Sequence, residues 1–299
     1  MSTELANPIE IKQVSGKRAL KEFIRVPWRI YRDDPNWVPP LLAERKEALS
    51  PKHPFFKHAD WCAWIAYRDG KPVGRISAQI DQLHESQHGH KLGFFGMLEA
   101  LDDDAVFKAL FETAENWLRD QGMQQMLGPF NLGINQEIGI LVEGFDSPPY
   151  IMMGHSPRYY DASIKRCNFR EAQDLLAYEV DAATVVIPRT MQALLKRSKG
   201  RVNVRVIDRK NKNRDLETMR KIFNDAWEKN WNFVPFTEEE FKAVGKELMM
   251  LLPPDYIQIA EIDGEPSAFI ALLPNINEVI ADLDGRLLPF GWARLAWRL

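Results

Sequence analysis

The stretch His58–Asp81, HADWCAWIAYRDGKPVGRISAQID, decides the fold of this chain. Aromatic and aliphatic residues dominate positions 61–67 and again 73–80, and the pair Asp69-Gly70 lies between these two runs. Such a pair between two apolar runs predicts a β-hairpin, because glycine readily adopts the positive φ that the turn requires. We therefore expect two antiparallel strands joined by a tight turn.

The same pattern returns in the second half of the chain. AYRDGKPVGRISA at 66–78 resembles AEIDGEPSAFIAL at 260–272, and NWVP at 36–39 resembles NFVP at 232–235. The two matches occur in the same order and with nearly the same offset, about 195 residues. A period of that length is too long for a solenoid repeat and predicts a duplicated domain.

The 299 residues suffice for two domains, expected at 1–181 and 201–299 with a linker at 182–200. The second copy has about 25 residues after its hairpin, where the first has about 80, so we expect the second copy to be truncated. Apolar side chains near the C-terminus should then pack on the first domain or form an exposed patch for self-association. These side chains are Leu287, Leu288, Phe290, Trp292, Leu295 and Trp297.

The composition, with 45% hydrophobic and 27% charged residues, predicts a soluble globular protein. A net charge of −3 gives no reason to expect a nucleic-acid partner. Two cysteines without metal-ligand spacing indicate a reducing cytoplasm and no metal site, and we expect His84, His88 and His90 to lie in a polar loop. Apolar runs are too short for a signal peptide or a membrane span.

Hydrophobic periodicity predicts the remaining elements. Helices are expected at 17–32, 41–49, 102–121, 159–167, 215–229, from 189 and from 237. Strands are expected at 9–14, 92–98, 123–130, 172–180 and 202–207. Pro27 should disturb the first helix, and Thr237 with Glu240 forms a capping-box pattern. The segment 128–160 is too rich in Gly, Pro and Asn for regular structure and too apolar for a solvated loop, which is typical of a functional loop.

This element order resembles that of the GNAT acyl-CoA N-acyltransferase superfamily. The stretches IYRDDPNWVPPL, GRISAQID, GFFGMLEA, GPFNLGINQEIGILVEGFDSPPYIMM and FREAQDLLAYEV are similar to those of an uncharacterised bacterial family with two GNAT-like domains. The resemblance implies an α/β fold with a mixed sheet, GNAT-like and duplicated, with an incomplete second copy. It also implies acyl-CoA or acetyl-CoA as co-substrate.

The chain departs from the superfamily at two places. The turn Arg/Gln-x-x-Gly-x-Gly/Ala, which holds the CoA pyrophosphate at a helix N-terminus, is replaced by Met97–Asp104, with four acids and neither Arg nor Gly. Carboxylates at that position repel a pyrophosphate. In the pattern Tyr-x-x-x-Gly-Phe, Ile164 takes the tyrosine position, and Tyr160 lies one turn earlier on the same helix face.

The resemblance implies a cleft in the first domain where the backbone of Phe94, Phe95, Gly96 and Met97 binds the acyl-pantetheine arm. Acyl transfer to an amine must remove a proton, and Glu137 is the candidate base. The other candidates are Tyr160 and His155 as proton donors to the thiolate, Asn131 and Asn135 as substrate-orienting groups, and Asp146 as the amine-binding group. The alternatives are turn-forming roles for these loop residues and a core-strand role for 94–97.

Three functions are compatible with these patterns. The first is an N-acyltransferase that acts on a small-molecule amine. The second is a catalytically degenerate GNAT-fold protein that binds a ligand or partner, which the missing pyrophosphate turn favours unless Arg158, Lys165 or Arg166 replaces it. The third is an aminoacyl transferase that uses aminoacyl-tRNA, which the low basic content argues against.

Overall fold

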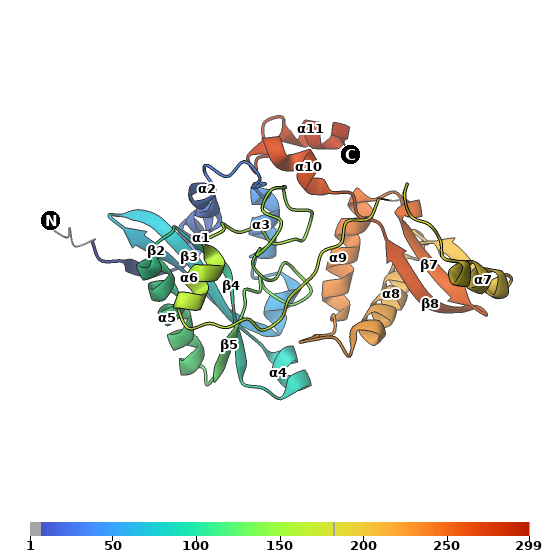
Figure 1. Cartoon of the computed structure of the whole chain (residues 1–299), viewed down its shortest axis with the longest axis horizontal. Coiled ribbons are helices and arrows are strands. Elements are labelled where there is room, and N and C mark those ends of the chain that lie inside the picture. Colours follow the sequence, from blue (N-terminus) through green and yellow to red (C-terminus); the bar gives the residue numbers. More distant parts are fainter. Residues whose placement is uncertain (1–6, 182, 299) are drawn as a thin grey trace. The chain divides into compact units, whose positions relative to one another are not determined.

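The computed structural model describes residues 7–181 and 183–298, which form two compact units (Figure 1). The first unit contains the described residues up to Ala172 together with those from Asn275 onwards, and the second unit is Gln173–Pro274. The sequence had placed every residue from 201 onwards in the second domain. The C-terminal segment belongs instead to the first unit.

Hydrogen bonds explain where the C-terminal segment lies. Leu42 N donates to Gly285 O at 2.9 Å, and Asn277 Nδ2 donates to Pro149 O at 2.8 Å. The apolar side chains of the segment nevertheless remain largely in solvent, since Phe290 is 72% and Trp297 is 87% exposed. Hydrogen bonds therefore hold the segment on the first unit, while Leu288, Phe290, Trp292 and Trp297 stay exposed, and self-association through them stays a prediction.

The sheet of the first unit is mixed, which confirms the predicted α/β class. Its strands follow the order β1 (Glu10–Gln13), β2 (Ala59–Arg68), β3 (Lys71–Asp81), β4 (Leu92–Ala100) and β5 (Gln125–Leu127). Neighbouring strands are antiparallel from β1 to β4, whereas β4 and β5 are parallel. Asp69 and Gly70 have φ of 53° and 69°, as the predicted hairpin turn requires.

The first unit forms the helices expected at 17–32, 41–49, 102–121 and 159–167, and it also has helices at 82–88, 276–280 and 291–298 that were not expected. Its helices are α1 (Gly16–Arg25), α2 (Pro27–Ile30), α3 (Leu42–Ala48), α4 (Gln82–His88), α5 (Asp104–Asp120), α6 (Tyr160–Arg166), α10 (Ile276–Ile280), α11 (Gly291–Arg298) and the 3₁₀ turns Pro54–Lys57 and Ala281–Leu283. The expected loop with His84 and His88 is helix α4. Asp81 caps this helix by accepting from Leu83 N at 2.9 Å, and Gly89 ends it at φ 66°.

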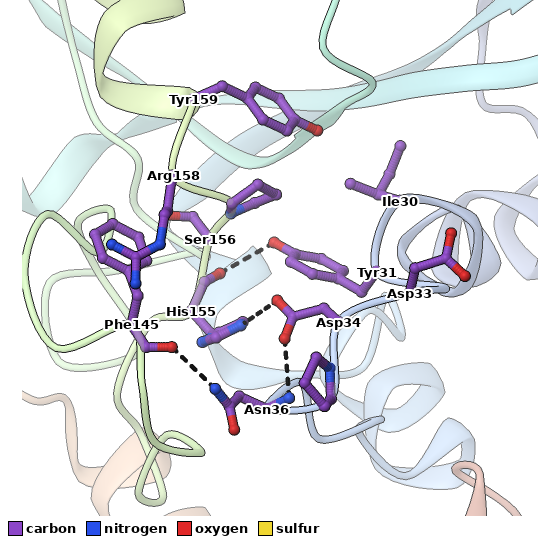
Figure 2. A pocket seen from close by; sticks show the side chains of 12 residues that line it. Ile30, Tyr31, Asp33, Asp34, Asn36, Phe145, His155, Ser156, Arg158 and Tyr159 are labelled. Atoms are coloured by element: carbon purple, nitrogen blue, oxygen red, sulfur yellow. Dashed lines mark hydrogen bonds and ion pairs between the residues drawn. The ribbon is translucent and has the colours of Figure 1, made fainter.

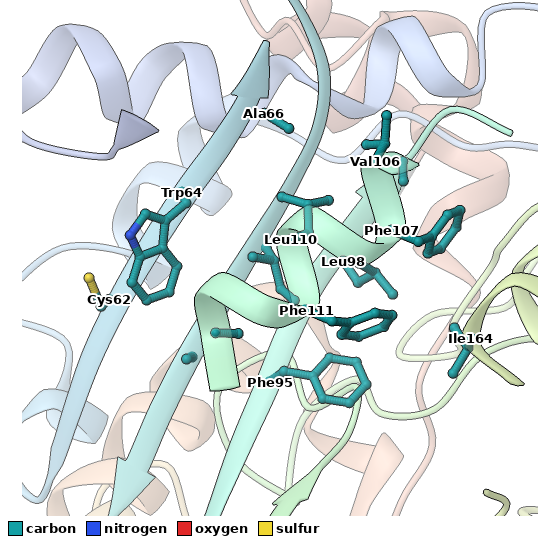
Figure 3. Close-up of a cluster of buried hydrophobic side chains, with 14 of the residues drawn as sticks. Cys62, Trp64, Ala66, Phe95, Leu98, Val106, Phe107, Leu110, Phe111 and Ile164 are labelled. Carbon is teal, nitrogen blue, oxygen red and sulfur yellow. The ribbon is translucent and has the colours of Figure 1, made fainter. Parts of the chain in front are cut away.

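Two layers of helices cover the sheet (Figure 1). Helix α5 and the start of α6 bury an apolar core against one face, drawn in Figure 3. Labelled members of this core include Trp64, Phe95, Leu98, Phe107, Leu110, Phe111 and Ile164. Helices α1 and α3 cover the opposite face, where Phe23, Ile65, Met97 and Leu132 belong to a second core. Among the described helices, none is both long and apolar enough to cross a membrane.

The long segment after β5 is irregular but fixed by hydrogen bonds. Phe130 N donates to Phe95 O at 2.7 Å, and Gly139 N donates to Pro129 O at 2.9 Å. The expected strand 123–130 is therefore shortened to β5. The expected strand 172–180 does not form. Its side chains are exposed, and its residues join no strand ladder of the described chain.

The second unit has its own sheet and core. Its strands are β6 (Val202–Val206), β7 (Ile257–Ile262) and β8 (Glu265–Ala271), paired antiparallel in that order. Its helices are α7 (Arg189–Ser198), α8 (Lys212–Trp227), α9 (Glu238–Leu251) and the 3₁₀ turn Pro254–Tyr256. The register of β7–β8 shifts between Ala260 and Glu261, and that of β2–β3 shifts between Ala66 and Tyr67. The two hairpins share this irregularity at matching positions, while duplication of the whole domain stays a prediction.

Replacing Thr237 by Ala is expected to destabilise the second unit by about 1 kcal/mol. Thr237 Oγ1 accepts from Glu240 N at 3.2 Å, and Glu240 Oε2 accepts from Thr237 N at 3.0 Å, so the predicted capping box is present. Faster hydrogen exchange of the α9 amides would measure the loss. Thr237→Ser keeps the hydroxyl and should restore protection, and equal exchange in both variants would contradict the role of the cap.

Candidate functional site

One face of β3 is polar although it is buried. Arg75, Ser77 and Gln79 point toward the layer of α1 and α3, and Ser77 and Gln79 have no exposed surface. Their opposite neighbours on β2, Ala63 and Ile65, belong to the apolar core of that layer. Buried polar side chains are costly unless they are bound, so this face has the character of a site.

Glu99 of β4 lies at the centre of this polar face. Its Oε1 is 3.5 Å from Arg75 Nη2, and its Oε2 accepts a hydrogen bond from the Tyr160 hydroxyl at 2.9 Å. Burial raises the pKa of Glu99 to about 7, although Arg75, Tyr31 and Tyr160 favour the ionised form. A carboxyl with a pKa near 7 is suited to take up and release a proton at neutral pH.

Tyr160 holds the end of β4 and contacts Glu99 with the same hydroxyl. The hydroxyl accepts from Ala100 N at 2.8 Å, while the neighbouring Tyr159 hydroxyl donates to Ala100 O at 2.7 Å. Burial, followed by the charge of Glu99, raises the pKa of Tyr160 well above its ordinary value. The hydroxyl therefore remains a hydrogen-bond donor to Glu99 at neutral pH.

Glu137 supplies a second carboxyl to the same cluster. Burial raises the pKa of Glu137, opposed by the charge of Arg45 and by a hydrogen bond from Asn131. The charge of Glu137 in turn raises the pKa of Glu99. Glu137 thus lies between Arg45, which favours its ionised form, and Glu99, whose pKa it raises.

The predicted acyl-pantetheine groups of β4 are engaged within the protein. Met97 N donates to Asn131 Oδ1 at 2.7 Å, and Phe95 O accepts from Phe130 N. A Cβ built on Gly96 would lie 1.8 Å from Phe130 O. The Phe95 side chain belongs to the core under α5, and the Phe94 side chain is buried beside the rings of His84 and Phe130. Donor binding by this backbone stays a prediction, and it requires the segment after β5 to move away.

A pocket with a volume of about 380 Å³ lies beside this cluster (Figure 2). His155 Nε2 is 2.8 Å from Asp34 Oδ2 in its wall, and the Tyr31 hydroxyl donates to His155 O at 3.0 Å. Burial opposes ionisation of Asp34, but hydrogen bonds from His155 and from Asn36 N lower its pKa. Tyr31 connects the pocket with the cluster around Glu99, because it lines the pocket and also stabilises ionised Glu99.

The structure groups some of the predicted site residues and separates others. Tyr160, Glu137 and Asn131 lie in the interior cluster, whereas His155 lies in the pocket wall. Asp146 is 94% exposed and pairs with Arg158 at 2.8 Å, and Asn135 lies half-buried in the loop. Among the described residues there is no group of three or more His, Cys, Asp or Glu suited to a metal ion.

Sequence patterns missed Arg75, Glu99, Tyr31 and Arg45. Glu99 was counted among the acids of the altered pyrophosphate turn, but its side chain points into the cluster. A signal was available, since Arg75 and Glu99 are charged residues inside otherwise apolar strands and are direct ladder partners. Pairing β3 with β4 in register would have placed these two charges side by side.

Replacing Arg75 by Met is expected to raise the pKa of Glu99 above about 7, because Arg75 favours the ionised carboxylate. A carbon-detected NMR titration of the Glu99 carboxyl would measure the shift. Arg68→Met is the matched control, since Arg68 pairs with Asp103 at 2.5 Å. An unchanged Glu99 titration in Arg75→Met would show that the two groups are not coupled.

Comparison with known sequences finds two bacterial relatives that align with nearly the whole of this chain. Protein YghO of Escherichia coli (strain K12) is 48% identical over 289 residues, which cover 97% of this chain and 74% of that protein. A protein named bacterial ceramide synthase, from Caulobacter vibrioides, is 47% identical over 294 residues, which cover 97% of this chain and 76% of the relative. The chain belongs to the family of these two proteins. No protein-family model matches the chain.

Two solved structures align with part of this chain. Aminoglycoside N-acetyltransferase AAC(6')-Iy in complex with CoA aligns over 60% of this chain and 99% of its own, with 17% identity and a TM-score of 0.34. An aminoglycoside acetyltransferase from an uncultured soil metagenomic sample aligns over 58% and 97%, with 11% identity and a TM-score of 0.36.

Proposed function

We propose that this family member is an N-acyltransferase that moves an acyl group from an acyl thioester, such as acyl-CoA, to the amine of a small molecule. The observation that carries the proposal is Glu99, a buried carboxyl with a pKa of about 7 that is hydrogen-bonded to Tyr160. A general base is most effective when its pKa lies near the working pH. The name of the Caulobacter relative favours a long-chain amino alcohol as acceptor, because a ceramide is the N-acyl derivative of such an amine.

The proposed reaction forms one bond and breaks one bond at the acyl carbon. The amine nitrogen attacks the thioester carbonyl carbon, and ionised Glu99 takes the proton that the nitrogen must lose. The tetrahedral intermediate collapses, the C–S bond breaks and the thiolate leaves. Glu99 returns the proton toward the thiolate through the Tyr160 hydroxyl, so that an amine and a thioester become an amide and a thiol.

A catalytically degenerate GNAT-fold protein is the second candidate. The backbone of β4 that would hold the donor is hydrogen-bonded to Phe130 and Asn131. Acidic residues also occupy the start of α5, where Asp103 accepts from Ala105 N at 2.9 Å. Both observations favour a ligand-binding protein if the donor cannot displace the segment after β5.

Calorimetric titration with acetyl-CoA and with hexadecanoyl-CoA separates the two candidates. Binding in the micromolar range, together with amide formation detected by mass spectrometry when sphinganine is added, is the expected result. Absence of binding up to millimolar donor would overturn acyl transfer from CoA thioesters and leave the degenerate binding protein. Binding without amide formation from sphinganine would overturn the long-chain amino alcohol as acceptor.

A further inference from the structure

Three polar atoms in a row on β3 lack a hydrogen-bond partner among residues 7–181 and 183–298. They are Arg75 Nε, Ser77 Oγ and Gln79 Oε1. An unpaired buried polar atom costs about 1–3 kcal/mol and is uncommon in native proteins. Because these atoms belong to successive inward positions of one strand, a common cause is the simplest account. A ligand that lies along the strand would satisfy all of them.

The three atoms change from hydrogen-bond donor to hydrogen-bond acceptor along the strand. Arg75 Nε offers only a donor. The Ser77 hydroxyl, two positions further along the strand, offers a donor as well as an acceptor. Gln79 uses its Nε2 group on Phe130 O at 2.7 Å and on Leu132 O at 2.8 Å, so that only its acceptor oxygen remains. The donor end of the row lies beside Glu99, since Arg75 is the ladder partner of Glu99.

We propose that Ser77 Oγ and Arg75 Nε bind the carbonyl oxygen of the acyl thioester, and that Gln79 Oε1 accepts a hydrogen bond from a hydroxyl of the acceptor. This inference rests on the proposed acyl transfer. The carbonyl oxygen gains negative charge as the amine attacks, and positioned donors in a site shielded from water stabilise that charge strongly. The backbone donor nearest this point, Met97 N, is already bound to Asn131.

Entry to the row requires a shift of the segment that covers it. Phe130 and Leu132 lie over Gln79, held by the two hydrogen bonds from its side-chain amide. Both bonds involve carbonyl oxygens of an irregular segment, so breaking them disrupts no pairing between the named strands of the sheet. The same movement would free the backbone of β4 next to Gly96.

The test compares a thioester with an analogue that lacks its carbonyl. Hexadecanoyl-CoA and S-hexadecyl-CoA, a thioether, are titrated into the wild-type protein and into Ser77→Ala. Loss of a neutral hydrogen bond should weaken thioester binding about five- to tenfold and leave thioether binding unchanged. The free variant should melt at the same or a higher temperature, because an unpaired buried hydroxyl has been removed.

Ser163→Ala is the matched control, since Ser163 is equally buried but accepts from Arg166 Nη2 at 2.9 Å. It should leave the ratio of thioester to thioether affinity unchanged. The inference would be overturned if Ser77→Ala lowered the affinity for both compounds equally, lowered neither affinity, or lowered the melting temperature. The proposed acyl transfer would stand in each of these cases. If the wild-type protein binds neither compound, the proposed function fails and the inference fails with it.

Discussion

Replacement of Glu99 by Gln is expected to lower the rate of amide formation by a factor of about 10²–10⁴. The amide side chain keeps the shape of the carboxyl and the contact with Tyr160, but it cannot accept the proton that the amine must lose. The rate is measured with hexadecanoyl-CoA and sphinganine at saturating donor. Donor affinity should change little, because Glu99 acts on the acceptor nitrogen.

The pH dependence of the rate of amide formation tests whether Glu99 is the base. The wild-type rate should rise with pH and level off above about 7, as Glu99 becomes ionised, and this rise should be absent from the residual activity of Glu99→Gln. The stability of the first unit should change in the opposite direction and fall as pH rises. Because folding raises the pKa of Glu99, its contribution to stability is complete below the unfolded value near 4.5 and disappears as pH rises through about 7.

Two further variants show whether the effect is specific to Glu99. Glu143 is exposed, so Glu143→Gln should retain the wild-type rate. Glu137→Gln removes a charge that raises the pKa of Glu99, and it should shift the pH profile to lower pH with a smaller loss of rate. A larger loss in Glu137→Gln than in Glu99→Gln would transfer the role of base to Glu137.

Replacement of Gly96 by Ala is expected to destabilise the first unit by at least about 3 kcal/mol. The added Cβ would lie 1.8 Å from Phe130 O, a backbone atom that is held from two sides. Phe130 N donates to Phe95 O, and Phe130 O accepts from Gln79 Nε2. The clash therefore displaces a whole segment, and loss of hydrogen-exchange protection in β4 would measure it.

Gly133→Ala tests the same substitution in the same segment without the clash. A Cβ added at Gly133 would lie 3.5 Å from the Phe55 ring, which is an ordinary contact distance. The change in stability should remain within about 1 kcal/mol. Similar protection of β4 in Gly96→Ala and Gly133→Ala would mean that the segment after β5 does not press on β4 in solution.

Local patterns predicted most of the elements because their causes are local. The Asp69-Gly70 turn, the helix opened by Asp103 and the capping box of Thr237 depend on residues within four positions of each other. Tyr160 and Glu137 became candidates through a resemblance and the need for a base, and their catalytic roles stay predictions. The strand expected at 172–180 failed because a strand depends on a partner, which its own residues do not specify.

The sequence by itself determined the hairpin, the approximate positions of the longer helices and the α/β class, since period, turn residues and caps act over a few positions. The tertiary structure alone decided that the polar face of β3 is buried as well as the apolar face. The alternation of Arg75, Ser77 and Gln79 with apolar residues is also that of a strand with one side in water. Helices α1 and α3 and the segment after β5 bury this side, and that burial brings Glu99 to a pKa of about 7. Desolvation arises from distant parts of the chain, so the site exists only in the folded molecule.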